Sequence, residues 1–285
     1  MMDELIAKAS TLIEALPYIK SFRGKEILVK YGGAALRHGE VRKHILQDLV
    51  FMQFVGIKPI LVHGGGKHIT ENMEKKGLAS KFVNGLRVTD EAAIQVVVET
   101  LAGINRELIA DVNLIGGSAV GLSGHDSDIL HVTRHTQNGD VGFVGDVAEV
   151  NIFPIRQMTD AGIIPIIYPV GIDKTGQTYN VNADEAACNI AMALKVPKMI
   201  MLTDVKGVMQ DPKDESSLIP TLTINEVEKL KASGVISGGM IPKVDSCLEV
   251  LRHGVKKAHI VDGRMKHPLL LEIFTDKGVG TEFVH

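Results

Sequence analysis

The sequence predicts an α/β fold in which one mainly parallel open sheet carries helices on both faces. Short, nearly continuous apolar runs rich in β-branched residues alternate with helical patterns along the whole chain. Several of these runs end directly in glycine-rich turns, and open α/β sheets bind their ligands at that carboxyl edge. The predicted strands are Glu26–Lys30, Pro59–His63, Ala119–Leu122, Ile164–Pro169, Lys198–Thr203 and Ala258–Val261.

Helical patterns, with apolar residues three or four positions apart, fill the segments between the strands. The predicted helices are Val41–Val55, Lys67–Lys76, Asp90–Leu101, Asn105–Leu114, Phe153–Ala161, Asp184–Leu194, Ile224–Ser233 and Lys243–Arg252. Two hairpins are also predicted: one spans Lys81–Val88, and the other joins Ile164–Pro169 to Gln177–Val181. Because no repeat or low-complexity linker interrupts the pattern, residues 25–285 are predicted to form a single domain.

Residues 1–24 precede this domain and carry a helical pattern of their own. The apolar residues form a single stripe at helical spacing, and Pro17 is expected to end the helix. The stripe consists of Leu5, Ile6, Ala9, Leu12, Ile13 and Leu16. An apolar stripe needs a partner, so the helix either folds back onto its own body or serves as an oligomerisation arm. The residues alone leave both open.

The composition favours a soluble globular protein and argues against several kinds of partner. Hydrophobic residues make up 45% of the 285 and charged residues 23%, and the formal net charge of −3 offers no broad positive surface to nucleic acid or an anionic membrane. Cys188 and Cys247 lie far apart without metal-ligand spacing, which fits buried thiols in a reducing compartment. No secretory signal pattern is visible at the N-terminus, and a cytoplasmic location is expected.

Three glycine-rich turns have features that favour anion binding. His63-Gly64-Gly65-Gly66 lies between a strand and a helix, where free N–H groups and the helix dipole point the same way. Lys30-Tyr31-Gly32-Gly33 ends the first strand, and its glycines let backbone N–H groups approach an anion. The third turn, Ser237-Gly238-Gly239, is followed by Lys243 at the start of a predicted helix. A lysine there opposes the helix dipole, which favours an anionic ligand nearby.

Three further motifs carry polar side chains. Arg87, within Asn84–Asp90, follows a turn and could bind a carboxylate in a two-pronged fork; the alternative is a solvated surface arginine. In Asn180–Asp184, alternation places three polar side chains on one side of the approaching strand, and the final aspartate is expected to cap the next helix. Leu202–Met209 leaves a strand and enters a loop that contains Asp204.

The motifs favour one class of chemistry over another. The tetrad at His63 also resembles the oxyanion-hole loop of lipases and esterases, but that reaction needs a Gly-x-Ser-x-Gly elbow, and Ser118, Ser123 and Ser237 all lack it. No Walker A motif or metal-binding histidine spacing is present. Phosphoryl transfer needs positioning and charge neutralisation. The motifs supply groups suited to both: two lysines beside glycine-rich turns, a triple-glycine loop, an aspartate and an arginine. A carboxylate acceptor would need no general base, because its ordinary pKa of about 4.3 leaves it ionised.

Taken in order, these motifs resemble those of the N-acetylglutamate kinases of arginine biosynthesis, a family in the amino-acid-kinase superfamily, from about residue 24 to the C-terminus. The resemblance implies the amino-acid-kinase fold, an αβα sandwich. Its N-terminal lobe, residues 25–175, would bind N-acetyl-L-glutamate, and its C-terminal lobe, residues 176–285, would bind ATP. It also implies that Mg²⁺ bridges the ATP phosphates, without a metal site made of protein side chains.

The resemblance further implies a role for each motif. Lys30 and Lys243 would neutralise charge on the transferred phosphoryl group, and Asp184 would hold both lysines in place. The residues implied in binding the acyl amino acid are Gly65, Gly66, Arg87 and Asn180. Those implied in binding the phosphates and nucleotide are Gly32, Gly33, Thr203, Asp204, Gly207 and Met209.

The N-terminal extension resembles the arginine-inhibited branch of this family, in which the first helix interlaces with a neighbour's and builds a hexameric ring of dimers. This favours the oligomerisation arm for residues 1–24. The residues implied in an L-arginine site are Tyr18, Lys20, His267, Glu272 and Gly278. Two alternatives stay open: a kinase for N-acetyl-aminoadipate or another amino acid, and a non-catalytic sensor of arginine or nucleotide. The presence of Lys30, Lys243 and Asp184 favours a catalyst.

Overall fold

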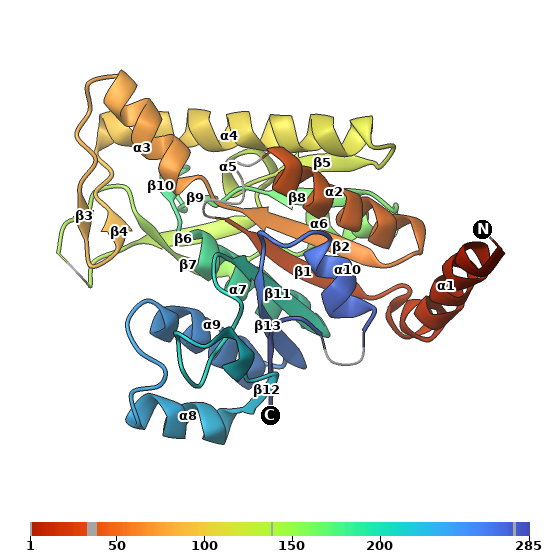
Figure 1. Cartoon of the computed structure of the whole chain (residues 1–285). Coiled ribbons are helices and arrows are strands. Elements are labelled where there is room, and N and C mark those ends of the chain that lie inside the picture. Colours follow the sequence, from red (N-terminus) through yellow and green to blue (C-terminus); the bar gives the residue numbers. More distant parts are fainter. Residues whose placement is uncertain (1, 33–38, 138, 276–277) are drawn as a thin grey trace.

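The computed structural model describes residues 2–32, 39–137, 139–275 and 278–285. An eight-stranded sheet forms its centre, in the order β12-β14-β13-β11-β1-β2-β8-β5 (Figure 1). Neighbouring strands are parallel except for β13 and β14. The strands are β1 (Glu26–Tyr31), β2 (Lys58–His63), β5 (Ala119–Leu122), β8 (Ile164–Ile167), β11 (Lys198–Thr203), β12 (Thr221–Thr223), β13 (Lys257–Asp262) and β14 (Thr281–Val284). The predicted fold class is confirmed.

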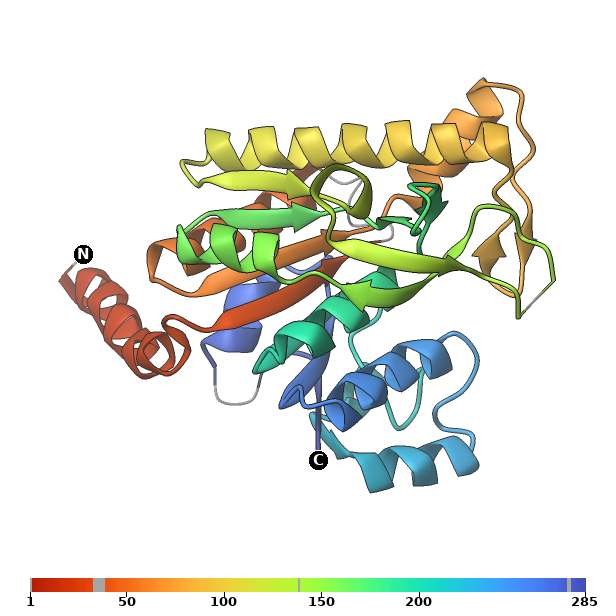
Figure 2. The ribbon, with the colours of Figure 1, turned by 180° about the vertical axis from the view of Figure 1, so that it is seen from behind.

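Side chains alternate between the two faces of the sheet. Helices cover each face (Figures 1 and 2). On one face Leu28, Ile60 and Met199 pack with α6, α7 and α9. On the other face Ile27 and Leu61 pack with α2, α4 and α10. These helices are α2 (Gly39–Phe54), α4 (Glu91–Leu114), α6 (Phe153–Asp160), α7 (Ala183–Leu194), α9 (Met240–Arg252) and α10 (Pro268–Ile273). The layers form an αβα sandwich. The described residues also form the helices α3 (Gly66–Lys75), α5 (Gly124–Ser127) and α8 (Ile224–Ala232).

Two smaller sheets accompany the central one: a four-stranded sheet in the order β10-β9-β6-β7 and the hairpin β3-β4. Their strands are β3 (Phe82–Val83), β4 (Leu86–Arg87), β6 (Leu130–Arg134), β7 (Gly145–Val150), β9 (Val170–Ile172) and β10 (Thr178–Asn180). The hairpin predicted over Lys81–Val88 is confirmed. The other predicted hairpin has its turn and second strand where expected, but its first strand is wrong: β2 and β5 occupy both edges of β8, and β10 pairs with β9 instead.

A predicted break between two helices is also wrong. Asp90–Leu101 and Asn105–Leu114 belong to the single helix α4. Asp90 caps it as expected, since its side chain accepts a hydrogen bond of 2.8 Å from the N–H of Ala93. Gly103 does not interrupt α4, because a continuous buried stripe along the helix outweighs the low helix propensity of one glycine.

The first helix, α1 (Met2–Phe22), continues through Pro17 rather than ending there. Packing holds its last turns despite the hydrogen bond that a proline removes: the ring of Tyr18 meets that of Phe274 edge-on, with ring centroids 6.3 Å apart. The apolar stripe, in contrast, is exposed within one chain, and Leu12 is 68% exposed. In the part of the chain that the structure describes, no helix is both long and apolar enough to cross a membrane.

Candidate active site

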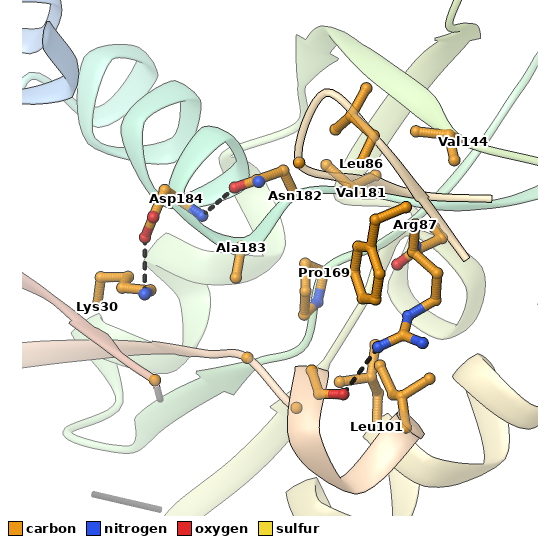
Figure 3. Close-up of a pocket in the computed structure, with 18 residues that line it drawn as sticks. Lys30, Leu86, Arg87, Leu101, Val144, Pro169, Val181, Asn182, Ala183 and Asp184 are labelled. Atoms are coloured by element: carbon orange, nitrogen blue, oxygen red, sulfur yellow. Dashed lines mark hydrogen bonds and ion pairs between the residues drawn. The ribbon is translucent and has the colours of Figure 1, made fainter. Parts of the chain in front are cut away.

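The carboxyl ends of β1 and β2 and the start of α7 surround a cavity of about 230 Å³ (Figure 3). Parallel strands end at the same edge of a sheet, so residues far apart in the sequence meet here. The predicted residues that line the cavity are Lys30, Gly32, Gly65, Gly66, Arg87, Asn180 and Asp184. Gly33 lies outside the described residues.

Lys30 and Asp184 form an ion pair on one side of the cavity (Figure 3). Lys30 Nζ lies 2.7 Å from Asp184 Oδ1, and the side chains are 14% and 36% exposed. The lysine side chain passes over Gly32, where a methyl group would come within 2.8 Å of Nζ. The glycine therefore leaves room for the ammonium group, whose other N–H donors can bind an anion.

The helix cap beside this pair differs from the prediction. Asn182, rather than Asp184, caps α7: its Oδ1 accepts hydrogen bonds from the N–H groups of Asp184, at 2.8 Å, and Glu185, at 3.3 Å. The helix begins at Ala183, so Asp184 already lies within its first turn. Because the cap is supplied by the asparagine, the Asp184 carboxylate is free to pair with Lys30.

The triple-glycine loop forms the floor of the cavity and leads into α3. The N–H of Gly64 donates to the carbonyl of Tyr31 at 3.0 Å. Gly65 caps α3, and a methyl group on it would lie 2.7 Å from Leu101 and 2.9 Å from Ile104 of α4, so a larger residue would force these two side chains to move. The first N–H groups of α3 have no partner within the helix, and its first turn carries no acidic residue. This arrangement favours the binding of an anion at the loop.

Arg87 lies on the other side of the cavity and is only 6% exposed (Figure 3). Its guanidinium donates to the Gly66 carbonyl at 2.8 Å and to Thr70 Oγ1 at 2.9 Å, contacts Ser80, and lies 4.7 Å from the ring centroid of Phe82. Burial lowers its pKa from the ordinary value. Within the described ranges no carboxylate pairs with it, and an unpaired buried cation favours an anionic ligand. This observation decides against the solvated surface arginine.

Two other predicted residues have different surroundings. Asn180 lines the cavity and donates from Nδ2 to Thr89 Oγ1 at 3.4 Å. Lys243 lies in the first turn of α9, a helix that packs against α7. Among the described residues its Nζ contacts the Gly239 carbonyl, at 3.4 Å, and no carboxylate. The structure thus joins Asp184 to Lys30, while the expected link to Lys243 stays a prediction.

The residues predicted to bind the nucleotide follow β11. Thr203 Oγ1 donates to the Val205 carbonyl at 3.0 Å and accepts from its N–H at 3.2 Å, which turns the chain at Asp204. Gly207 has φ +149°, and a methyl group on it would lie 2.5 Å from Thr281 Oγ1, so this loop needs a glycine. Met209 forms an isolated β-bridge with Leu218.

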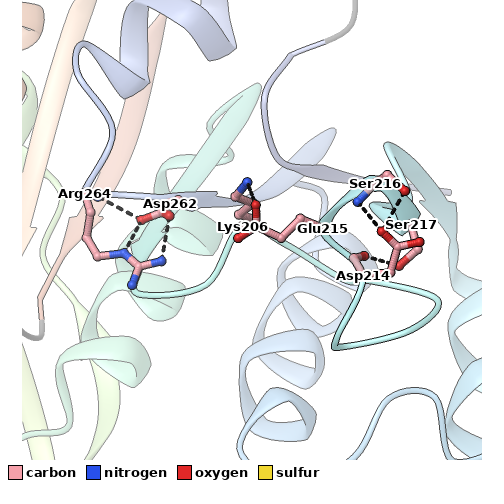
Figure 4. A network of polar contacts seen from close by, with 7 residues as sticks. All are labelled: Lys206, Asp214, Glu215, Ser216, Ser217, Asp262 and Arg264. Carbon is pink, nitrogen blue, oxygen red and sulfur yellow. Dashed lines mark hydrogen bonds and ion pairs between the residues drawn. The ribbon is translucent and has the colours of Figure 1, made fainter.

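Ion pairs brace the edge of the sheet beyond this loop (Figure 4). Lys206 Nζ lies 2.5 Å from Glu215 Oε2. At the end of β13, Arg264 binds Asp262 through Nε at 2.9 Å and Nη2 at 2.8 Å. The Asp262–Arg264 fork fixes the segment that leads from β13 to α10.

A second cavity, of about 530 Å³, separates α1 from the C-terminal strands and includes three of the five residues predicted to bind arginine: Tyr18, Glu272 and Gly278. Glu272 is 5% exposed, and its Oε1 lies 2.6 Å from His259 Nδ1. Burial alone would raise the pKa of Glu272, but the hydrogen bond from His259 helps to lower it below the ordinary value. Lys198, only 6% exposed, is a further cation of the cavity.

The structure does not place the other two predicted residues in this cavity. His267 Nδ1 lies 2.6 Å from Asp48 Oδ1, and Lys20 is exposed on α1. Sequence reasoning missed Lys198 and His259, which sit inside apolar strands and belong to no motif. Their only signal is a charged or polar residue within an otherwise apolar run.

A model of the amino acid kinase family matches residues 25–262. The chain belongs to the amino acid kinase family. It is 51% identical over 277 residues to the acetylglutamate kinase of Thermoanaerobacter pseudethanolicus, covering 97% of this chain and 93% of that one. It is 46% identical to the acetylglutamate kinase of Syntrophomonas wolfei, with all of both chains covered. The resemblance inferred from the motifs is confirmed, and the chain is a phosphotransferase.

Solved structures share the amino acid kinase fold. An N-acetylglutamate synthase from Neisseria gonorrhoeae, complexed with coenzyme A and N-acetyl-glutamate, superposes with a TM-score of 0.85 at 24% identity, over 97% of this chain and 63% of that one. A carbamate kinase from Giardia lamblia bound to AMP-PNP gives a TM-score of 0.66 at 15% identity, over 92% of this chain and 98% of that one. At these identities the likeness concerns the fold alone.

Proposed function

We propose that this amino acid kinase is an acetylglutamate kinase, which converts ATP and N-acetyl-L-glutamate into ADP and N-acetyl-L-glutamyl 5-phosphate, the second step of arginine biosynthesis. The observation that carries the proposal is the unpaired, buried guanidinium of Arg87 facing a cavity whose other side holds the Lys30–Asp184 pair. A substrate with two carboxylates fits these two sides, one bound and one reacting.

The chemistry follows from the charges at the site. Arg87 and Asn180 bind the α-carboxylate and the acetylamino group, which directs the side-chain carboxylate toward the glycine loop. An oxygen of that carboxylate bonds to the γ-phosphorus of ATP as the bond to the β–γ bridging oxygen breaks, and ADP leaves. No proton is transferred in this step. Lys30 and Lys243 neutralise charge on the phosphoryl group, and the N–H groups at Gly65 and Gly66 donate to it.

The nucleotide completes the proposal. Residues 176–285 would bind ATP through Thr203, Asp204, Gly207 and Met209, and residues 25–175 would supply most of the acyl-amino-acid site. Mg²⁺ would be held by the phosphate oxygens, whose charge it offsets. In the described part of the chain, no three His, Cys, Asp or Glu side chains lie close enough together to hold a metal ion. A cytoplasmic location belongs to the same proposal.

The test is an ADP-release assay with ATP and Mg²⁺, comparing N-acetyl-L-glutamate with N-acetyl-aminoadipate and free glutamate. Preferential turnover of N-acetyl-L-glutamate supports the proposal. Preference for N-acetyl-aminoadipate would instead assign the substrate that is one methylene group longer, a difference worth about 1–3 kcal/mol in an apolar pocket. If none of the three substrates led to ADP release, the proposed function would be contradicted.

We further propose that L-arginine inhibits the enzyme by binding in the cavity beside α1, with its guanidinium at Glu272. Replacing Glu272 with glutamine should raise the arginine concentration for half-inhibition about 10- to 100-fold, because the negative charge that would pair with the guanidinium is removed. Dose–response curves of ADP release give this value. The control is Glu282→Gln: Glu282 lines the same cavity but pairs with Lys257 at 2.7 Å, and its replacement should have the smaller effect. Equal effects of the two changes would contradict the assignment.

The exposed stripe of α1 supports a role in assembly, with a hexamer built as a trimer of dimers as the proposed state. Replacing Leu12 and Ile13 together with aspartate should reduce the mass in solution to that of a dimer, because charges would enter an apolar contact. Light scattering during gel filtration measures this mass. Thr11→Asp, on the opposite side of the helix, is the matched control and should keep the larger assembly. An unchanged mass in the double variant would contradict the proposal.

A further inference from the structure

A polar pair is buried beneath the triple-glycine loop. His63, the last residue of β2, is 0% exposed, and Asn105, in the middle of α4, is 3% exposed. Asn105 Nδ2 lies 2.8 Å from the Ile166 carbonyl and 3.1 Å from His63 Nε2. His63 Nδ1 lies 3.0 Å from the carbonyl of Gly64. Burying two polar side chains is unfavourable without such bonds, so each contact constrains the others.

The contacts determine which ring nitrogen of His63 carries the proton. The Ile166 carbonyl can only accept, so it requires the amide nitrogen of Asn105 on that side. The second N–H of this amide donates to His63 Nε2, which is therefore unprotonated. The proton lies on Nδ1 and donates to Gly64. The ring is neutral, because burial lowers the pKa of His63 to about 4.

This hydrogen bond sets the direction of a peptide group in the loop. The peptide between Gly64 and Gly65 is trans, so its C=O and N–H groups point in opposite directions. Its C=O points down to the buried imidazole. Its N–H therefore points away from the core, toward the cavity that both glycines line. Among the described residues, that N–H donates to no protein acceptor.

We propose that His63 and Asn105 are positioning residues, which hold the Gly64–Gly65 peptide so that its N–H group faces the reacting carboxylate and phosphoryl group. The inference rests on the proposed phosphoryl transfer. A donor that is already oriented stabilises charge that develops during the reaction more than charge present in the bound substrate. The pair should therefore affect kcat more than KM.

Two replacements of His63 separate this role from a general contribution to stability. The amide of asparagine reaches the position of the histidine Nδ1, and the amide of glutamine reaches that of Nε2. His63→Asn can still donate to Gly64, whereas His63→Gln can bond to Asn105 but not to Gly64. We expect His63→Gln to lower kcat about 10- to 100-fold, with KM for N-acetyl-L-glutamate changed less than about threefold. His63→Asn should keep kcat within about fivefold of the wild type.

Thermal unfolding of both variants is measured alongside the kinetics. His63→Asn keeps the hydrogen bond to Gly64 and His63→Gln keeps the one to Asn105, so each variant loses one of the two bonds of His63. If the role were only structural, kcat would fall in proportion to the loss of thermal stability in both variants. Wild-type kcat in His63→Gln, or an equal loss in the two variants, would overturn the proposal. A wild-type enzyme that turns over none of the tested carboxylates would instead refute the proposed function, so the two failures are distinguishable.

The wild-type protein provides a second measurement that needs neither turnover nor folding of the variants. Nitrogen-15 spectra of histidine-labelled protein should show His63 protonated at Nδ1 and unprotonated at Nε2, with no titration between about pH 5.5 and 8. The hydrogen bond from His63 Nδ1–H to the Gly64 carbonyl should appear as a scalar coupling between the Nδ1 nitrogen and the carbonyl carbon of Gly64. A proton on Nε2, or a ring that titrates in this range, would overturn the proposal.

Discussion

Replacing Lys30 with methionine should lower kcat about 100- to 1,000-fold and change KM for the acyl substrate much less. Methionine is unbranched and only one atom shorter than lysine but carries no charge, so the phosphoryl group would lose a donor at the point where charge develops. Asp184 would also lose its partner at 2.7 Å. Steady-state kinetics with both substrates measure the effect. Lys243→Ala is expected to act in the same direction, through kcat more than through KM.

Lys58→Met is the matched control for this experiment. Lys58 begins β2, at the opposite edge of the sheet from the site, and pairs with the exposed Asp160 at 2.6 Å. Ion pairs at the surface contribute little to stability, so kcat and KM of the Lys58→Met variant should match those of the wild type. If Lys30→Met turned over at the wild-type rate, Lys30 would have no part in the mechanism.

Replacing Arg87 with lysine should raise KM for N-acetyl-L-glutamate about 10- to 100-fold with little change in kcat. Lysine keeps the positive charge but lacks the planar fork that binds a carboxylate through two N–H groups, and the lost hydrogen bond to a charged group is worth about 1.5–3 kcal/mol. In the proposed mechanism Arg87 binds a part of the substrate that does not react, so binding of the ground state and of the transition state should weaken equally.

The control for Arg87→Lys is Arg134→Lys, since Arg134 is half-exposed and pairs with an exposed carboxylate, Asp140. Thermal unfolding of both variants separates a binding defect from a folding defect, because Arg87 also contacts Thr70 and Phe82. An unchanged KM would remove Arg87 from the substrate site. A fall in kcat at unchanged KM would place it at the reacting group instead.

The central strands were predictable because they are buried on both faces and read as continuous apolar runs. The predicted strand Lys198–Thr203 has the bounds of β11, for example. The strands that were missed are short or partly exposed. β12 has three residues, and β6 carries a register shift at His131 that disrupts its alternation. The two halves of α4 were separated at Gly103 because propensity is local, whereas the buried stripe that joins them depends on the rest of the fold.

The site was predictable where its residues belong to sequence motifs that are specific when taken together. The motifs that contain Lys30, Arg87 and Asp184 carried the resemblance in this way, and the structure brings all three residues to one cavity. The cap at Asn182 was assigned to the wrong residue because sequence does not tell where a strand ends and a helix begins to within two positions. The contact between His63 and Asn105 joins β2 to α4 through space, and nothing local in the sequence marks it.

The strand order has a consequence for how the polypeptide matures. β1 is the first strand to be synthesised, yet one of its neighbours, β11, comes more than half a chain later. Contacts between such distant segments slow folding, because a long loop must close before the pairing stabilises it. A nascent chain that ends before β11 therefore has an open edge beside β1, where another chain can pair. During translation β1, one of the two central strands of the finished sheet, is also the strand that stays longest without both of its neighbours.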